Sequence, residues 1–222
     1  HAAAPRLRPA TRAAGPPLHS GLNPIPMADT STPFRDSASG PGSGPASGRT
    51  AGGSPGPDAD IDLVIFGGTG DLSIRKLQPA LYMADAHGLL PDDLRILALG
   101  RRPLDRAGYQ ASVLEPSREF IDAASFDEAA WRRFCDRISY VVVDADRAED
   151  YLLLKAAMRL DARAVFYLAT APDLFAGICS QLGAAGLVDA RSRVVLEKPL
   201  GHDLASARAI NRDVGRHFAE RQ

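Results

Sequence analysis

Three glycines stand within four residues in the stretch IDLVIFGGTGDLSIRKL, which covers Ile61 to Leu77. A glycine-rich turn between a strand and a helix lets backbone N–H groups approach a pyrophosphate, and the helix N-terminus adds a partial positive charge. Gly68, Gly70 and Ser73 match the Gly-x-Gly-x-x-Gly fingerprint of such turns, with a small serine where close packing leaves little room. A structural hairpin or a helix-capping turn would use the same residue types. The motif alone does not distinguish these possibilities, but a strand before it and a helix after it favour a dinucleotide site.

Arg75 and Lys76 add two positive charges near the beginning of that helix. A cation in the first turn opposes the positive end of the helix dipole by about 0.3 to 1 kcal/mol, so we expect an anion nearby to offset it. Ordinary solvated surface charges are the alternative. Pro79 must kink or restart the helix, because proline lacks the N–H group that a helix interior requires.

A second strand, Leu94 to Leu99, ends in Gly100-Arg101-Arg102. A fold that binds NAD normally places a carboxylate at this point, where it accepts hydrogen bonds from the ribose hydroxyls. Here the charge is inverted. Because a guanidinium offers phosphate a planar fork of donors, Arg101 is expected to bind the 2'-phosphate of NADP, and Arg102 to share the task.

The last predicted strand runs into Glu197-Lys198-Pro199 in the segment VVLEKPLGHDLASA. Open parallel sheets bind their ligands at the carboxyl ends of the strands, and this lysine would stand there. A lysine at such a position needs a charged or polar partner to offset its desolvation, so we expect Lys198 to contact ligand. Pro199 restricts the backbone before it and permits a cis bond, either of which would fix the direction of the ammonium group. His202 is interpreted as an exposed residue at a helix start.

The elements that must position these residues alternate between strands and helices, which is typical of a doubly wound, Rossmann-like parallel sheet with helices on both faces. One apolar stripe, formed by Leu204, Ala207, Ile210, Val214 and Phe218, indicates that the last helix covers the sheet. The predicted strands are IDLVIF, LRILAL, ISYVVV, AVFYLA and RVVLE, and the predicted helices cover residues 71–86, 105–118, 126–136, 148–160, 173–185 and 203–218.

Residues 1 to 60 are rich in Pro, Gly, Ala and Ser and lack periodic apolar positions, so they are expected to be a disordered extension before the domain of residues 61–222. The three arginines of the first stretch loosely resemble a transit peptide, but its prolines do not suit an amphipathic helix. The chain begins with His1, so the favoured interpretation is that translated upstream sequence precedes a start at Met27.

Composition narrows the partners of the protein. The 222 residues carry a formal net charge of −1 with 45% hydrophobic residues, which gives no electrostatic reason to expect nucleic acid or a membrane surface. No apolar run approaches the roughly 18 residues that span a bilayer. Cys135 and Cys179 lack metal-ligand spacing and disulfide density, so no metal site is expected and both thiols are predicted to be reduced and structural in a cytoplasmic protein.

Three segments together resemble the amino-terminal domain of the glucose-6-phosphate dehydrogenase family: DLVIFGGTGDLSIRKLQPALY, FYLATAP and RVVLEKPLGHDLASA. The likeness covers Ile61 to Gln222 and is specific in the combination of its motifs. The resemblance implies that Lys76 lies near the pyrophosphate and that Arg101 binds the 2'-phosphate. It also implies that the pyrophosphate is held by the turn residues Gly67, Gly68, Thr69, Gly70, Asp71 and Leu72.

The same resemblance implies roles that the residues alone do not suggest. Val143 and Asp144 would border the adenosine half of NADP, and Tyr167 to Pro172 would line the nicotinamide side, although Ala171 replaces a proline that many members carry. For Val143 and Tyr167, ordinary strand packing is the alternative. Lys198 would contact both the cofactor and the sugar phosphate.

Family members continue into a motif, RIDHYLGKE, that binds glucose 6-phosphate, and later supply the histidine that acts as general base. We therefore expect this chain to be a fragment without the family's second, α+β domain, able at most to bind nucleotide, while the full-length enzyme is expected to form a homo-oligomer. The expected reaction is oxidation of glucose 6-phosphate with reduction of NADP. The alternatives are another NADP-dependent sugar oxidoreductase with an EKP motif, or a non-enzymatic domain that senses NADP.

Overall fold

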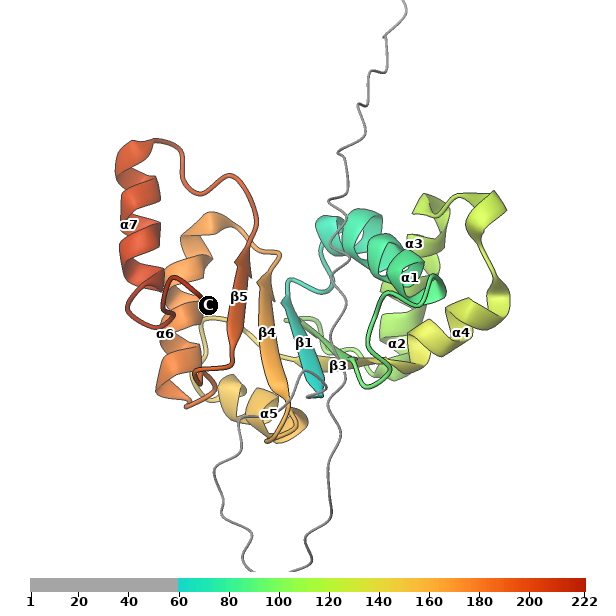
Figure 1. The fold of residues 1–222 in the computed structure, drawn as a ribbon, viewed down its shortest axis with the longest axis horizontal. Coiled ribbons are helices and arrows are strands. Elements are labelled where there is room, and N and C mark those ends of the chain that lie inside the picture. The colour runs from blue at the N-terminus through green and yellow to red at the C-terminus, as the bar shows by residue number, and fades with distance from the viewer. Residues whose placement is uncertain (1–59) are drawn as a thin grey trace, which may run out of the picture. The chain divides into compact units, whose positions relative to one another are not determined.

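The computed structural model describes residues 60–222, which form a five-stranded parallel sheet with helices on both faces (Figure 1). The predicted extension over residues 1 to 60 lies outside the described residues, apart from Asp60. The strand order is β3-β2-β1-β4-β5. The strands are β1 (Ile61–Phe66), β2 (Arg95–Gly100), β3 (Ile138–Val142), β4 (Arg163–Leu168) and β5 (Arg193–Leu196).

The first strand, β1, lies in the middle of the sheet, and the later strands are added first on one side of it and then on the other. From β1 it passes to β2 and β3 on one side, and then crosses to β4 and β5 on the other. This is the doubly wound order, so the predicted fold class is confirmed. The predicted bounds of β1 are confirmed, and the other four strands were placed within one residue at each end.

Helices cover both faces of the central strands, and alternate residues of β1 and β2 belong to different cores. In β1, Val64 and Phe66 pack toward one core while Ile65 packs toward the other. This alternation follows from the two-residue period of a strand. It explains why the central strands read as continuous apolar runs, since both of their faces are covered by helices, whereas Val142 of β3 and Val195 of β5 are exposed at the sheet edges.

The helices divide between the two faces. Tyr82 of α1, Tyr109 of α2 and Trp131 of α4 fill one core, whereas Tyr151 of α5 and Phe175 of α6 fill the other. The helices are α1 (Gln78–Ala86), α2 (Arg106–Tyr109), α3 (Glu115–Ser117), α4 (Glu128–Asp136), α5 (Asp150–Ala157), α6 (Phe175–Ala184) and α7 (Leu204–Val214). Short 3-10 turns cover Arg118–Phe120, Ala123–Ser125 and Pro172–Leu174.

Two predicted helices are interrupted by π-helical turns, at Ser73–Leu77 and Gln110–Leu114. Each turn lies two residues before a proline, Pro79 in α1 and Pro116 in α3. A proline ring contacts the carbonyl group four residues earlier, and the wider turn relieves that contact. The helix predicted over residues 105–118 is present as a continuous helical run whose form changes along its length, and the expected restart of the first helix at Pro79 is confirmed.

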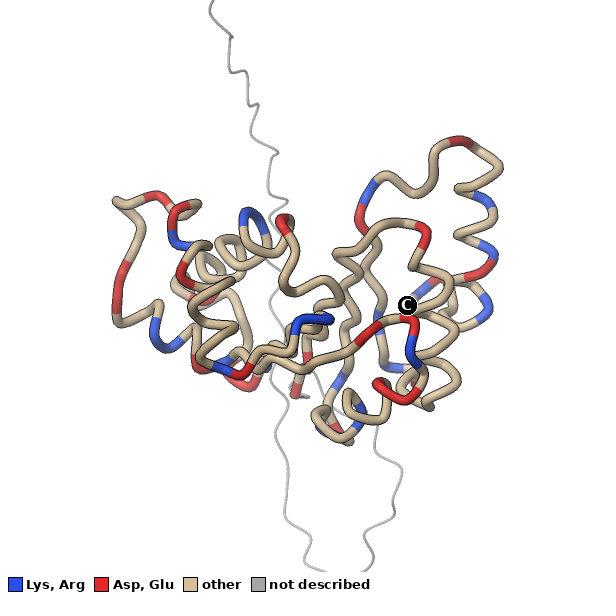
Figure 2. The backbone as a smooth tube through the Cα atoms, turned by 180° about the vertical axis from the view of Figure 1, so that it is seen from behind, with Lys and Arg blue, Asp and Glu red and all other residues tan. Residues whose placement is uncertain are grey.

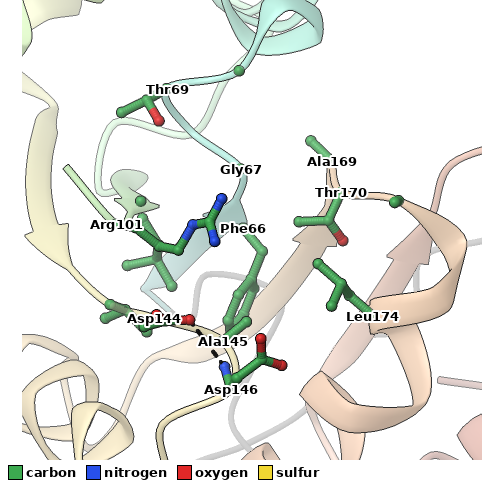
Figure 3. Close-up of a pocket in the computed structure, with 15 residues that line it drawn as sticks. Phe66, Gly67, Thr69, Arg101, Asp144, Ala145, Asp146, Ala169, Thr170 and Leu174 are labelled. Atoms are coloured by element: carbon green, nitrogen blue, oxygen red, sulfur yellow. Dashed lines mark hydrogen bonds between the residues drawn. The ribbon is translucent and has the colours of Figure 1, made fainter.

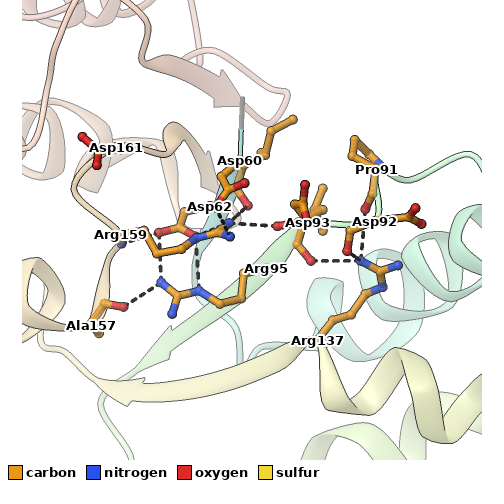
Figure 4. Close-up of polar contacts among 12 residues, drawn as sticks. Asp60, Asp62, Pro91, Asp92, Asp93, Arg95, Arg137, Ala157, Arg159 and Asp161 are labelled. Carbon is orange, nitrogen blue, oxygen red and sulfur yellow. Dashed lines mark hydrogen bonds and ion pairs between the residues drawn. The ribbon is translucent and has the colours of Figure 1, made fainter. Parts of the chain in front are cut away.

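A buried ion-pair network joins the strands at the end of the sheet where β1 begins (Figure 4). The Asp62 carboxylate is completely buried and accepts hydrogen bonds from Arg95 Nε at 3.2 Å and Arg159 Nε at 2.9 Å. Arg159 also donates to the Asp60 carboxylate, at 2.7 Å. Because Asp62 lies directly opposite Arg95 in the parallel ladder, the network fixes the register of β1 against β2.

Figure 2 shows that basic and acidic residues are interspersed along the described chain. None of the helices within residues 60–222 is long and apolar enough to cross a bilayer. Cys135 and Cys179 are free, buried thiols that belong to opposite cores. Burial raises the pKa of Cys135 to about 11 and that of Cys179 to about 12, which favours structural thiols over reactive ones.

Candidate functional site

A cavity of about 340 Å3 opens where the strands end at their carboxyl termini (Figure 3). It lies beside the boundary of β1 and β4, the switch point where the winding of the sheet reverses and where open α/β sheets bind ligands. Its walls are the turn after β1, the end of β2, the segment after β3 and the segment after β4. The lining includes Phe66, Gly67, Thr69, Gly70, Gly100, Arg101, Val143, Asp144, Ala145, Asp146, Ala169, Thr170, Ala171 and Leu174.

The turn after β1 requires glycine for two different reasons. Gly67 has a positive φ of 81°, and a Cβ atom there would lie 2.4 Å from the carbonyl oxygen of Ala169. Gly68 packs against β2, where a Cβ atom would lie 2.8 Å from that of Ala98. The turn is closed by the Gly70 N–H, which donates to the Gly67 carbonyl oxygen at 2.9 Å. These contacts bring the backbone of the turn to the edge of the cavity.

The helix after the turn directs its first N–H groups toward this edge of the sheet. Its first backbone hydrogen bond runs from the Ile74 N–H to the Gly70 carbonyl oxygen, at 3.1 Å. The N–H groups of residues 71–73 precede that bond, and such groups have no partner within a helix. Ser73 is completely buried and its hydroxyl accepts a hydrogen bond from Gln78 Nε2 at 3.3 Å. The small residue of the fingerprint therefore stands where packing leaves little room.

Arg101 is exposed at the end of β2, and Figure 3 shows its guanidinium directed into the pocket. Arg101 forms no ion pair with a carboxylate of residues 60–222. Asp144 and Asp146 lie across the cavity, and Asp144 Oδ1 accepts the Asp146 N–H at 3.2 Å. A guanidinium without a carboxylate partner in residues 60–222, beside a glycine-rich turn, is suited to an anionic ligand.

Arg75 and Lys76 both have exposed side chains, which is compatible with the alternative that they are ordinary surface charges. Arg75 forms an ion pair with Asp71 at 3.8 Å and lies over the ring of Phe120, 5.1 Å from its centroid. Because the helical run begins at Asp71, Arg75 lies beyond its first turn and its charge is offset within the protein. Asp71 therefore gives Arg75 a partner within the protein, and the external anion expected at this helix start stays a prediction.

The second predicted cluster follows β5, outside the cavity. The hydroxyl group of Tyr167 donates a hydrogen bond to Glu197 Oε1, and Lys198 next to it is exposed. Burial, and then the Glu197 carboxylate, raise the pKa of Tyr167 to about 12, so the hydroxyl remains a donor at neutral pH. The peptide bond between Lys198 and Pro199 is cis, one of the two possibilities derived from the sequence.

The predicted cofactor residues thus divide into two groups. Those at the cavity are Gly67, Thr69, Gly70, Arg101, Val143 and Asp144. Those outside its lining are Gly68, Asp71, Leu72, Lys76, Tyr167 and Lys198. Gly68 is outside because it packs against β2, whereas Lys76 and Lys198 have exposed side chains.

Sequence reasoning missed several residues at the site. Asp146 and Leu174 line the cavity through segments whose placement depends on the whole topology. Thr170 belongs to the segment that the resemblance implied, but its hydroxyl is notable because it is buried without a hydrogen-bond partner among residues 60–222. No group of three His, Cys, Asp or Glu side chains in the described part of the chain is arranged to hold a metal ion.

The strand order, the glycine turn and the cavity at the switch point define a Rossmann-like domain. The family model described as "Glucose-6-phosphate dehydrogenase, NAD binding domain" matches residues 64–222. The chain belongs to the glucose-6-phosphate dehydrogenase family, as the motifs of the sequence predicted.

Individual relatives agree with the family match. Glucose-6-phosphate 1-dehydrogenase of Mycolicibacterium smegmatis is 46% identical over 176 residues, which cover 76% of this chain and 35% of the relative. The enzyme of that name from Gluconobacter oxydans is 42% identical over 167 residues, which cover 72% of this chain and 34% of that relative. The chain therefore spans about a third of the length of these curated relatives.

Solved structures show the same fold. A glucose-6-phosphate 1-dehydrogenase from Mycobacterium avium aligns with a TM-score of 0.64 at 32% identity, over 73% of this chain and 34% of that structure. A glucose-6-phosphate dehydrogenase in complex with its substrate glucose-6-phosphate aligns with a TM-score of 0.63 at 30% identity. The alignment covers 73% of this chain and 35% of that structure.

Proposed function

We propose that this chain is the NADP-binding part of a glucose-6-phosphate dehydrogenase, which oxidises glucose 6-phosphate to 6-phosphogluconolactone in the first step of the pentose phosphate pathway. The observation that carries the proposal is Arg101, an exposed guanidinium without a carboxylate partner in residues 60–222, directed into the cavity at the switch point. Family membership favours this enzyme over another sugar oxidoreductase with an EKP motif.

The residues at the cavity fit the cofactor. The Gly67 to Gly70 turn would hold the pyrophosphate at the edge of the cavity, together with the N–H groups of residues 71–73, which precede the first hydrogen bond of the helix. Lys76 would add positive charge near this group. Val143 and Asp144, where the chain leaves β3, would border the adenosine. When bound, NADP supplies the acceptor for the hydride that leaves the first carbon of the sugar.

Lys198 is the residue of this chain that we propose for contact with both substrates. Glu197, the residue before it, is anchored by the hydroxyl of Tyr167, which extends from the end of β4 next to β5. This anchor fixes the backbone from which the lysine starts, while its exposed ammonium group remains available. A lysine there would bind the sugar phosphate as a point charge and orient the sugar toward the nicotinamide.

The wider setting of the enzyme remains a prediction. Glucose 6-phosphate is the proposed substrate, in keeping with the solved relative in complex with that substrate. A cytoplasmic location and assembly of the full-length enzyme into a homo-oligomer stay predictions from the sequence.

Replacing Arg101 with alanine is expected to weaken NADPH binding by about ten- to a hundred-fold, because a charged hydrogen bond to phosphate contributes roughly 1.5 to 3 kcal/mol. NADH lacks the 2'-phosphate, so its affinity should change less than about two-fold. Both affinities can be measured without turnover, from the change in nicotinamide fluorescence on titration.

The matched control is Arg132→Ala, which removes the same charge from an exposed position of α4, away from the cavity. It should leave both affinities unchanged. Equal losses for NADPH and NADH in Arg101→Ala would contradict the assignment of Arg101 to the 2'-phosphate.

A further inference from the structure

Two stacked tyrosines lie beneath the candidate site and touch both of its key turns. The rings of Tyr109 and Tyr140 are 4.8 Å apart between centroids and nearly parallel, with an interplanar angle of 17°. Tyr109 comes from α2 and Tyr140 from β3. Neither lines the cavity, so neither is placed to contact a ligand held there.

Tyr140 is hydrogen-bonded to the turn that carries Arg101. Its hydroxyl donates to the carbonyl oxygen of Arg102 at 2.8 Å, and the N–H of Leu104 donates to the same oxygen at 2.9 Å. The hydroxyl also lies close to Gly100, where a Cβ atom would stand 2.9 Å from it and 2.9 Å from Thr69 Oγ1. Tyr140 Oη is thus held near the residues on both sides of Arg101 in the sequence.

Tyr109 is hydrogen-bonded to the glycine turn. Its hydroxyl donates to the Gly68 carbonyl oxygen at 3.0 Å and accepts from Gln78 Nε2 at 3.4 Å. The side chain is almost completely buried, and this burial is the main cause of a raised pKa, which keeps the hydroxyl protonated. The stack therefore joins the Gly68 peptide to the turn after β2 through two hydroxyl groups and one ring contact.

We propose that Tyr140 is a positioning residue that sets the preference for a 2'-phosphorylated dinucleotide by fixing the turn from which Arg101 extends. This inference rests on the proposed function, because it presumes that Arg101 binds the 2'-phosphate. A turn that is already held in the binding conformation loses less conformational freedom when the ligand arrives. Tyr109 supports the ring of Tyr140 and holds the Gly68 peptide, which serves the pyrophosphate common to both nucleotides.

The test is the variant Tyr140→Phe, which removes the hydroxyl and keeps the ring stack. The Arg102 carbonyl keeps its bond from Leu104 N–H, so the fold is expected to persist. We expect NADPH affinity to fall by about three- to ten-fold, the range of one hydrogen bond, with NADH affinity unchanged within about two-fold. Tyr109→Phe should instead weaken both nucleotides by similar factors, because Gly68 belongs to the shared part of the site.

A double-mutant cycle separates positioning from a general loss of structure. If Tyr140 acts through Arg101, the variant Tyr140→Phe combined with Arg101→Ala should bind NADPH no more weakly than Arg101→Ala alone. The control Tyr82→Phe removes another buried hydroxyl, bonded to the backbone of Asp127 in the helical layer, and should leave both affinities unchanged.

The outcomes also separate this inference from the function on which it rests. If Arg101→Ala leaves NADPH affinity unchanged, the proposed function fails. If Arg101→Ala weakens NADPH selectively but Tyr140→Phe has no effect, weakens both nucleotides equally, or adds fully to Arg101→Ala, the positioning role of Tyr140 is overturned while the proposed function stands.

Discussion

Asp62→Asn is expected to lower the free energy of unfolding by about 3 to 5 kcal/mol, the typical cost of removing one partner from a buried ion pair. The Asp62 carboxylate is completely buried and receives hydrogen bonds from Arg95 and Arg159, including the Arg159 backbone N–H at 2.8 Å (Figure 4). The asparagine keeps the shape of the side chain but lacks the negative charge. Its amide group would also place N–H donors against guanidinium donors.

The midpoint of urea unfolding, with its slope, measures this loss. Asp60→Asn is the matched control, because Asp60 pairs with the same Arg159 from a half-exposed position, where an ion pair contributes about 1 kcal/mol or less. The network lies where the strands begin, away from the cavity at their carboxyl ends, so the folded fraction of Asp62→Asn should bind NADPH with unchanged affinity. Equal destabilisation by the two variants would contradict the prediction, because it would mean that the burial of Asp62 does not increase its contribution to the free energy of unfolding.

The Asp62 network also shows where sequence reasoning ends. The apolar runs and the helical periods predicted every strand and the order of the elements, because those signals are local in the chain. Asp62 and Arg95 stand 33 positions apart and meet only because β1 and β2 pair in one particular register. Nothing in either segment alone specifies that register, so Asp62 could not be identified as a buried partner.

The candidate site divides in the same way. The glycine turn and Arg101 were predictable because each is a short motif directly after a strand, at the edge where parallel sheets bind ligands. Tyr109 and Tyr140 were not, since each reads as an ordinary apolar position and their stacking requires the end of α2 to pack against β3. The π-helical turns were missed because a proline indicates an irregularity in a helix without specifying its form.

Gly67→Ala is expected to lower the free energy of unfolding by about 2 to 5 kcal/mol, the sum of left-handed backbone strain and overpacking. The new Cβ atom would lie 2.4 Å from the Ala169 carbonyl oxygen, which is backbone and cannot turn aside as a flexible side chain would. Relief requires β1 and β4 to separate at the point where the Ala169 N–H donates to the Phe66 carbonyl oxygen at 3.0 Å. Because that point forms part of the cavity, NADPH and NADH affinity should fall together.

Substitutions at two other glycines separate the contribution of backbone strain from that of overpacking. Gly88→Ala carries a positive φ of 66° with no atom within 4 Å of the new Cβ, so it should lose only the backbone strain of about 1 to 2 kcal/mol. Gly177→Ala lies on an open face of α6 and should gain up to about 1 kcal/mol from helix propensity. In urea unfolding, Gly177→Ala should be the most stable protein, followed by the parent protein, then Gly88→Ala and finally Gly67→Ala. A Gly67→Ala protein as stable as Gly88→Ala would show that the Ala169 backbone yields without cost, and the close contact that shapes this turn would then not constrain the site.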